Sequence, residues 1–455
     1  MRLAIRGQLD SALGELAALC AIPSVSARSE ALEPCAELVA AQMREHGLQA
    51  EVMPTAGGPP IVFGSLAGRQ PDAPTILLYN HYDVQPPEPL DLWESPPFEL
   101  TIRSGVAFGR GVGDDKGHIT SRLLTLDALR AVTGELPFNV KFLVEGEEEI
   151  GSPHLGDWIL AHPGLLAADA CIWEEGMVTP EGAPLLYCGM RGIACFELRC
   201  HTISHDAHSG FGGSILPNAA WRLAWALASL KSQDERIAIF GHYDTAVLPT
   251  IRDLQLLSAL PNDAAEVRNR YVLPDSGFLG GRQTDGLEYH RRAVFEPSLT
   301  INGLDAGWQG PGSKTVLPAD ARAKIDFRLV PDQDPATVGR LLREHLDRLG
   351  FEDVESVYLN GQRPARVDPD HPWVRLAAET GEQVYQQQAA IAPMLGSSGP
   401  MWWFAHHLGL PIATPGIEYP GLRAHSPNEN VRLDDFELGT LHCAHLLSRV
   451  GELPR

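Results

Sequence analysis

Carboxylates and histidines gather at four places in the chain, in patterns that suit metal binding or acid–base chemistry. The segments are His81-Tyr82-Asp83, GRGVGDDKG (109–117), EGEEEIGS (145–152) and Glu174-Glu175. Imidazole and carboxylate ligands suit zinc, and they also accept manganese or cobalt. Each segment has a plainer alternative, namely a loop histidine beside an aspartate, an Asp-Gly turn at a helix start, or a solvated run of charge.

Position in the fold favours chemistry over these alternatives. Three of the segments follow short apolar runs, TILLYN (75–80), NVKFLVE (139–145) and ADACIW (168–173), which are typical of buried parallel strands. Helical spacing after Lys116 predicts the order strand, helix, strand, helix, strand. We therefore expect an α/β fold with an open, mostly parallel sheet flanked by helices, and ligands beyond the carboxyl ends of its strands.

The joint charge of this predicted site calls for cations. Asp114, Glu148, Glu149 and Glu174 at neighbouring strand ends would repel one another unless cations or raised pKa values offset the repulsion. Two divalent ions balance three ligand carboxylates plus hydroxide, and one carboxylate remains to carry the proton of an attacking water. The alternative, a protein whose acidic clusters are only solvated, predicts no stoichiometric zinc.

The pattern of the chain changes near residue 191. Strand-like alternation at 192–201 and 321–330 and helical periodicity at 217–230 and 338–349 predict a separate α+β domain. The stretch 232–295 is expected to hold helices and exposed loops. A helical segment at 373–385 and a short apolar run at 410–414 then continue the α/β pattern of the first domain. We predict a first domain in two parts, 1–190 and 366–455, with an inserted domain at 191–365.

Composition limits the partners. The 455 residues carry 36 Lys plus Arg against 58 Asp plus Glu, a formal charge of −22, which predicts neither nucleic acid nor membrane as a partner. The first residues predict an amphipathic helix and not a signal peptide, and no apolar run reaches the roughly 18 residues that a bilayer requires. Seven cysteines without C-x-x-C spacing indicate reduced thiols. We expect a cytoplasmic protein.

Several motifs together resemble a known family. NHYDVQPPEPLDLWESPPF, GRGVGDDKG, EGEEEIGS, HDAHSGFGGS, GSKTVLP, IDFRLVP and RAHSPNEN occur in the order seen in the co-catalytic zinc metallopeptidases. This family includes carnosinase-like dipeptidases, glutamate carboxypeptidase, aminoacylase and the acetylornithine and succinyl-diaminopimelate deacylases. The resemblance implies a zinc-peptidase fold with an inserted lid domain that also dimerises, and two divalent ions per subunit, Zn²⁺ or else Mn²⁺ or Co²⁺.

The resemblance also implies roles for individual residues. The implied metal ligands are His81 and Glu174 on one ion, Glu149 and His425 on the other, and Asp114 bridging both ions. The resemblance also implies that the Asp114-Asp115 peptide is cis. Glu148 would be the general base and acid, and Asp83 would orient His81. His208 would stabilise the oxyanion in the partner subunit's site, and Arg328 would hold a substrate carboxylate. Asn302 and Ser398 are further candidates for substrate contact, although in glycine-rich loops these residue types often serve turns.

This set of residues predicts hydrolysis of an amide beside a free α-carboxylate, in a dipeptidase or carboxypeptidase. The alternative is a deacylase of N-acyl amino acids. Two departures from the dipeptidases keep it open: Glu174 stands where those members commonly carry Asp, and GSSGP (396–400) replaces a GGSIP-like loop. A more distant alternative is a non-catalytic binding protein on the same scaffold.

Overall fold

Two compact units make up the chain. The computed structural model describes residues 1–455 except 71, 263, 274–276, 279–285 and 454–455. Unit 1 comprises Met1–Gly189, Arg366–Met394 and Pro400–Arg455, and unit 2 comprises Met190–Ala365 and Leu395–Gly399. The predicted domains differ from this division at Met190, which the prediction placed in the first part, and at 395–399, which it placed with 366–455. This segment belongs to unit 2 because Leu395 forms a parallel bridge with Met190, and the Arg191 N–H donates to the Ser397 carbonyl at 3.0 Å.

Unit 1 contains most of the helices and a central sheet. Its helices are α1 (Arg2–Cys20), α2 (Leu32–Glu45), α3 (Lys116–Thr133), α4 (Leu155–Ala161), α11 (Pro372–Tyr385) and α12 (Leu433–Ser448), with short helices η1 (Ser26–Arg28), η2 (Leu90–Leu92), η3 (Glu148–Ile150), η5 (Trp403–His407) and η6 (Val450–Glu452). Its strands are β1 (Gln49–Met53), β2 (Ile61–Leu66), β3 (Thr75–His81), β4 (Thr101–Arg103), β5 (Val106–Phe108), β6 (Asn139–Glu145), β7 (Ala170–Ile172), β8 (Met177–Val178), β9 (Pro184–Tyr187), β18 (Ala390–Ala392), β19 (Ile412–Ala413) and β20 (Asn430–Arg432). The chain passes between the units at β10 (Gly189–Met190) and β17 (Ala365–Arg366).

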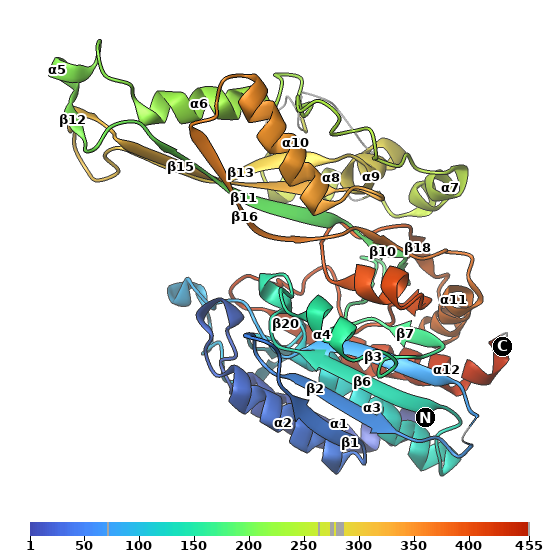
Figure 1. Cartoon of the computed structure of the whole chain (residues 1–455). Helices are drawn as coiled ribbons and strands as arrows, with labels where there is room; N and C mark the ends of the chain where they lie inside the picture. Colours follow the sequence, from blue (N-terminus) through green and yellow to red (C-terminus); the bar gives the residue numbers. More distant parts are fainter. Residues whose placement is uncertain (71, 263, 274–276, 279–285, 454–455) are drawn as a thin grey trace. The chain divides into compact units, whose positions relative to one another are not determined.

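The central sheet has the order β1-β2-β6-β3-β7-β19 (Figure 1). Strands β6, β3, β7 and β19 run parallel, and β2 and β1 extend the sheet antiparallel at one edge. The open, mostly parallel sheet predicted from the sequence is therefore confirmed. Because β6, β3 and β7 are adjacent and parallel, the residues that follow each strand lie at the same edge of the sheet.

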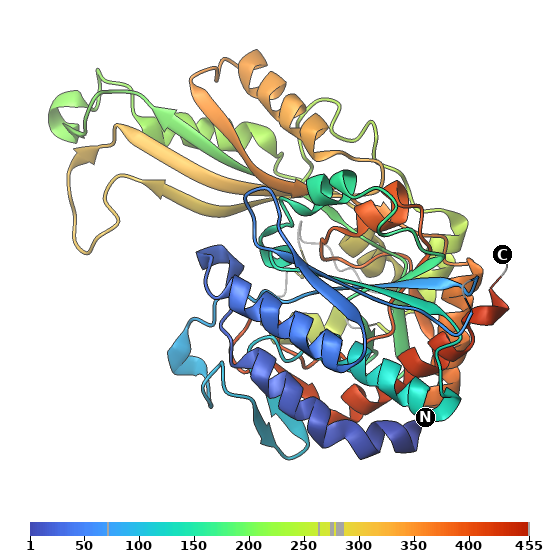
Figure 2. The same cartoon turned by 60° about the horizontal axis from the view of Figure 1, so that its bottom comes forward.

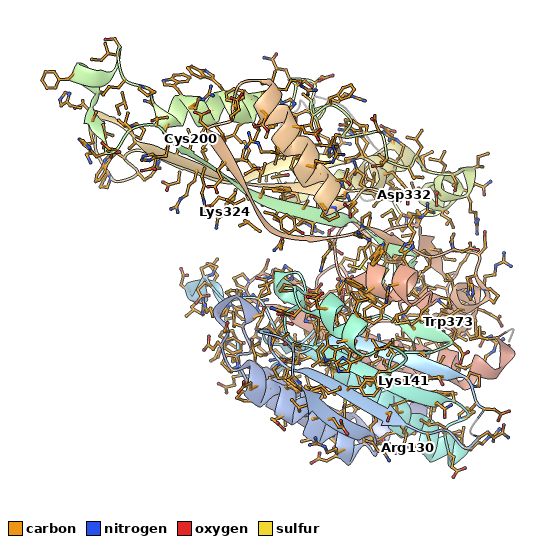
Figure 3. The ribbon with its side chains drawn as sticks, in the orientation of Figure 1. Arg130, Lys141, Cys200, Lys324, Asp332 and Trp373 are labelled. Atoms are coloured by element: carbon orange, nitrogen blue, oxygen red, sulfur yellow. The ribbon has the colours of Figure 1, made fainter. Side chains whose placement is uncertain are left out.

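Both faces of this sheet are covered, which explains the continuous apolar runs of its strands. Ile76 and Leu78 of β3 pack with residues of α2, α3, α11 and α12, and α1 and α2 lie side by side beneath the sheet (Figure 2). On the opposite face Tyr79 stacks on Trp173, with ring centroids 4.4 Å apart. Trp373 of α11, labelled in Figure 3, donates from its indole Nε1 to the Cys171 carbonyl at 3.0 Å and thereby ties α11 to β7.

Unit 2 is an α+β domain built on a four-stranded antiparallel sheet of order β13-β15-β11-β16. Its strands are β11 (Gly192–His201), β12 (Ala207–His208), β13 (Ser298–Ala306), β14 (Val316–Leu317), β15 (Asp320–Leu329) and β16 (Val354–Gln362). Its helices are α5 (Ser209–Gly212), α6 (Ala219–Leu230), α7 (Ile251–Ala259), α8 (Ala264–Arg270), α9 (Gly286–Phe295) and α10 (Pro335–Arg348). Helices α6 and α10 cover one face of the sheet (Figure 1), as the alternating and helical segments predicted.

Two further sequence predictions concern the whole chain. Among the described residues, no helix combines the length and hydrophobicity needed to cross a bilayer. All seven cysteines are free thiols, and six of them are buried.

Candidate metal centre

The ends of three parallel strands and the start of one helix supply the acidic site of unit 1. His81 is the last residue of β3, Glu148 and Glu149 form η3 just after β6, and Glu174 follows β7. Asp114 lies two residues before α3. These are the positions that the strand and helix pattern predicted from the sequence. The fifth expected ligand, His425, lies just before β20 in the C-terminal part of unit 1, and the fold brings it to the same place.

Asp114 lies between the two histidines. Its Oδ1 is 3.1 Å from His81 Nε2, and its Oδ2 is 3.0 Å from His425 Nε2. His425 Nε2 is also 3.1 Å from Glu149 Oε2. The Asp114-Asp115 peptide is cis, as the resemblance implies. One carboxylate therefore faces two imidazoles that come from strands and loops more than 300 residues apart.

Ligand-type atoms form two compact groups within the described residues. The groups are His81, Asp115 and Glu174, and Asp114, Glu149 and His425; within each group the atoms lie within 4.8 Å of one another. Sequence reasoning gave Asp115 no role, although its adjacency to Asp114 could have drawn attention to it. One oxygen of its carboxylate is already engaged, since Oδ2 accepts from Asn80 Nδ2 at 2.7 Å and from the His81 N–H at 3.0 Å. Asp114 is thus the carboxylate better placed to serve both groups.

Asp83 contacts three of the predicted residues. The Nδ1 of His81 lies 3.1 Å from the Asp83 carbonyl and 3.3 Å from its Oδ1. The same carboxylate accepts from the Glu148 and Glu149 N–H groups, each at 3.1 Å. Because Nδ1 faces acceptors, a neutral His81 carries its proton there and presents the lone pair of Nε2 to the site.

The electrostatics of the site favour bound cations. Burial, followed by the nearby carboxylates, raises the pKa of Glu148 and Glu174 well above the usual range, and the pKa of Glu149 is raised as well. Hydrogen bonds to Asp114 and Glu149 raise the pKa of His425 to about 11. Glu174 Oε2 is buried and has no hydrogen-bond partner among the described residues. Two imidazoles and three carboxylates are a donor set that fits two zinc, manganese or cobalt ions.

Two predicted substrate contacts meet in unit 2. Arg328 Nη1, near the end of β15, donates to Ser398 Oγ at 2.9 Å. The Arg328 side chain is 35% exposed, and its Nε lies 3.6 Å from Asp326 Oδ1. Within the described residues Nη2 has no hydrogen-bond partner, so the guanidinium keeps a donor available for an anion.

His208 and Asn302 lie elsewhere in unit 2. The exposed His208 accepts the Gly210 N–H on Nδ1 at 3.0 Å, so a neutral His208 carries its proton on Nε2, 3.4 Å from Thr315 Oγ1. Asn302 is exposed at the bulge of β13, whereas Arg328 pairs with Ser298 of that strand. The structure does not bring Asn302 to the Arg328–Ser398 pair. The sequence analysis did not single out Thr315 as a neighbour of His208, although Thr315 belongs to the GSKTVLP motif.

Comparisons with known proteins identify the family. The chain matches the model of peptidase family M20/M25/M40 over residues 77–449 and belongs to this family. The Beta-Ala-His dipeptidase of Mus musculus is 30% identical over 340 residues, which are 74% of this chain and 67% of the relative. The cysteinylglycine-S-conjugate dipeptidase of Corynebacterium striatum is 28% identical over 98% of this chain and 96% of its own length. The M20 family metallo-carboxypeptidase Sso-CP2 from Sulfolobus solfataricus has a TM-score of 0.91 at 31% identity, covering 97% of this chain and 99% of that chain.

These findings confirm the resemblance that the motifs indicated. The chain is an enzyme of the metal-dependent peptidase class.

Proposed function

We propose that this enzyme hydrolyses dipeptides, or the last peptide bond of short peptides, beside a free α-carboxylate. The observation that carries the proposal is the placement of Asp114 between His81 and His425, at 3.1 and 3.0 Å. Similarity to two dipeptidases and a metallo-carboxypeptidase supports it.

The donor set assigns ligands to two ions. His81 and Glu174 would hold one ion, Glu149 and His425 the other, and Asp114 both; zinc fits this set, with manganese or cobalt as alternatives. When bound, the ions would activate a water for attack and polarise the scissile carbonyl. Asp83 keeps the Nε2 of His81 available for this task through its contact with Nδ1.

Glu148 is proposed as the proton carrier. It is not a member of either ligand group, and the Asp83 carboxylate holds its backbone N–H at 3.1 Å. A carboxylate with a raised pKa takes the proton of the attacking water and then gives it to the leaving amine nitrogen. The water oxygen stays on the acyl product as a carboxylate, and the C–N bond breaks.

Substrate recognition is assigned to unit 2. Arg328, with Ser398, would bind the α-carboxylate of the substrate through charge-assisted hydrogen bonds. His208, whose Nε2 is a donor in the neutral tautomer, would stabilise the oxyanion in the site of a second copy. Asn302, exposed on β13, remains a candidate for substrate contact from the same unit.

Exposed apolar surface of unit 2 supports a homodimer. In the sheet, β13 is an edge strand, with Ile301 51% and Leu304 62% exposed. Helix α6 presents Trp221 and Trp225, which are 61% and 56% exposed. Their rings stack, with ring centroids 5.9 Å apart. Open edges and exposed aromatic patches are features that a partner chain covers. The free thiols of the seven cysteines support a reducing, cytoplasmic location.

A paired substrate panel tests the proposal. Purified enzyme loaded with Zn²⁺ or Mn²⁺ is assayed on free dipeptides and on N-acetyl and N-succinyl amino acids, with chelator-treated enzyme as the control. We expect dipeptide turnover that falls to background on chelation and returns when the ion is restored. Turnover of acylated amino acids alone would overturn the proposal in favour of a deacylase, and no turnover of either class would favour the binding protein.

A further inference from the structure

The segment Asn428-Glu429-Asn430 carries side chains that the proposed mechanism leaves unused. It follows His425 by three residues and is buried. Asn428 accepts the Glu94 N–H at 2.8 Å and donates to the Leu92 carbonyl at 2.9 Å. Asn430 donates to the carbonyls of Gly421 and Leu422 at 3.0 and 3.3 Å. Side chains of this segment therefore hold the turn that presents His425.

Glu429, between these two asparagines, is bonded to the loop of Asp114. Its Oε1 accepts the N–H groups of Gly113 and Asp114, both at 3.1 Å, and its Oε2 accepts the N–H of Gly111 at 3.2 Å. Arg110 Nη1 donates to Oε2 at 2.6 Å. Four donors from one five-residue loop thus converge on a single carboxylate more than 310 residues away in sequence.

The burial of this pair makes the arrangement hard to replace. The side chains of Glu429 and Arg110 are each 1% exposed, so the carboxylate charge is balanced inside the protein by one guanidinium. Gly111 has a φ of +84°, and the loop therefore depends on a backbone conformation that side chains disfavour. Removing the acceptor would leave buried N–H groups unpaired in the loop that carries Asp114.

We propose that Glu429 is a positioning residue for the metal centre, which fixes Asp114 relative to His425. The inference rests on the proposed function, because it takes both residues as ligands. Asp114 is the ligand shared by both ions, so a displaced loop weakens the binding of both. Glu429 itself belongs to neither ligand group found in the described residues, and it acts only through the Asp114 N–H and its neighbours.

The test compares Glu429→Gln with Glu437→Gln by titration with Co²⁺. Glu437 is a matched control, because it is a carboxylate of α12 that is 8% exposed and pairs with Arg2 and Arg6 away from the ligand loops. Glutamine offers one acceptor oxygen where four donors converge. We expect Glu429→Gln to bind Co²⁺ about 10- to 100-fold more weakly, with altered visible absorption of the bound ion. We expect its kcat to fall while the KM for a dipeptide changes little, since Arg328 and Ser398 are untouched.

The outcomes separate this inference from the proposed function. Glu429→Gln with the Co²⁺ affinity and absorption of the wild type would overturn the positioning role, even if its thermal stability fell. Equal losses in Glu437→Gln would also overturn it, since the effect would then be general. If Glu429→Gln does not fold, Glu429→Asp, which keeps the charge one methylene short of the loop, is judged by the same criteria. A wild-type enzyme that binds no Co²⁺ would instead overturn the proposed function, and this inference with it.

Discussion

Four of the proposed metal ligands of unit 1 and the proposed substrate contacts of unit 2 are held in opposite ways, whereas the fifth ligand, His425, is 55% exposed. The His81 and Glu149 side chains are 2% and 4% exposed, and Asp83 fixes both the imidazole of His81 and the backbone of Glu149. Arg328 is 35% exposed with one hydroxyl partner, and His208 is exposed on a short strand. The first set is ordered by its own fold, whereas the second presents donors to something that binds there.

This difference separates catalytic power from substrate selection. Substitutions in the buried centre should lower kcat, because the chemistry depends on groups already in place. Substitutions among the exposed contacts should chiefly change KM, since those groups gain their partners only when a substrate arrives.

The largest expected effect comes from the proposed proton carrier. In Glu148→Gln the side chain keeps its size and loses its basic oxygen, so we expect kcat for a dipeptide to fall about 10²- to 10⁴-fold. Because Glu148 belongs to neither ligand group of the described residues, the variant should still bind two ions per subunit. Steady-state kinetics together with metal analysis of the same preparation measures both quantities.

Glu147→Gln is the matched control for this variant. Glu147 is buried, its carboxylate accepts from the His154 N–H at 2.7 Å, and it belongs to neither ligand group of the described residues. Its kcat should stay close to that of the wild type. Comparable activity in Glu148→Gln and the wild type would contradict the assignment of the proton carrier.

Much of the buried centre could be predicted from the sequence, and physical reasons explain why. Buried parallel strands are read from apolar runs, and the runs ending at His81 and Glu145 fix where the polar residues emerge. Charge repulsion among the four carboxylates then indicates cations. Without the resemblance, His425 could not have been placed, because nothing local links it to His81, which lies more than 300 residues earlier in the sequence.

The contacts that stabilise the metal centre could not be predicted from the sequence. Glu429 lies in a quoted motif, yet its four donors come from a loop that only the folded chain brings near. The position of residues 395–399 in unit 2 could not be predicted either, since the bridge from Leu395 to Met190 joins segments about 200 residues apart in sequence. Asn302 was named as a further candidate for substrate contact, and the register of β13 and β15, in which Ser298 pairs with Arg328, could not be predicted from the sequence.

A smaller effect is expected at the exposed contacts. Arg328→Gln removes the guanidinium that we assign to the α-carboxylate, and we expect kcat/KM for dipeptides to fall about 10- to 100-fold, mostly through KM. Arg322→Gln is the control, because Arg322 lies on the same strand and pairs with the exposed Asp305 at 3.0 Å. With the wild type, kcat/KM for a C-terminally amidated dipeptide should be lower than for the free dipeptide by the same factor. With Arg328→Gln, amidation of the dipeptide should lower kcat/KM little further. An unchanged KM in this variant would contradict the carboxylate assignment.

The smallest effect on activity is expected at a charged cluster of unit 1 that takes no part in the chemistry. His46 Nε2 is 2.9 Å from Glu15 Oε2 of α1, and Nδ1 is 2.8 Å from Asp127 Oδ2 of α3; Arg130 contacts the same Asp127. Burial opposes the charged form, but the hydrogen bonds to Asp127 and Glu15 raise the pKa of His46 from 6.5 to about 9.

Because the folded pKa of His46 is the higher one, its contribution to stability is complete below about pH 6.5 and is lost as the pH rises through about 9. The full contribution is about 3 kcal/mol at most. We expect His46→Gln to have a lower Tm than the wild type at pH 6, a gap that narrows by pH 9.5, and an unchanged kcat at pH 7. A Tm difference that stays constant with pH would show that His46 stabilises the helices by packing alone. A reduced kcat would contradict the assignment of the His46 cluster as structural and separate from the catalytic groups of unit 1.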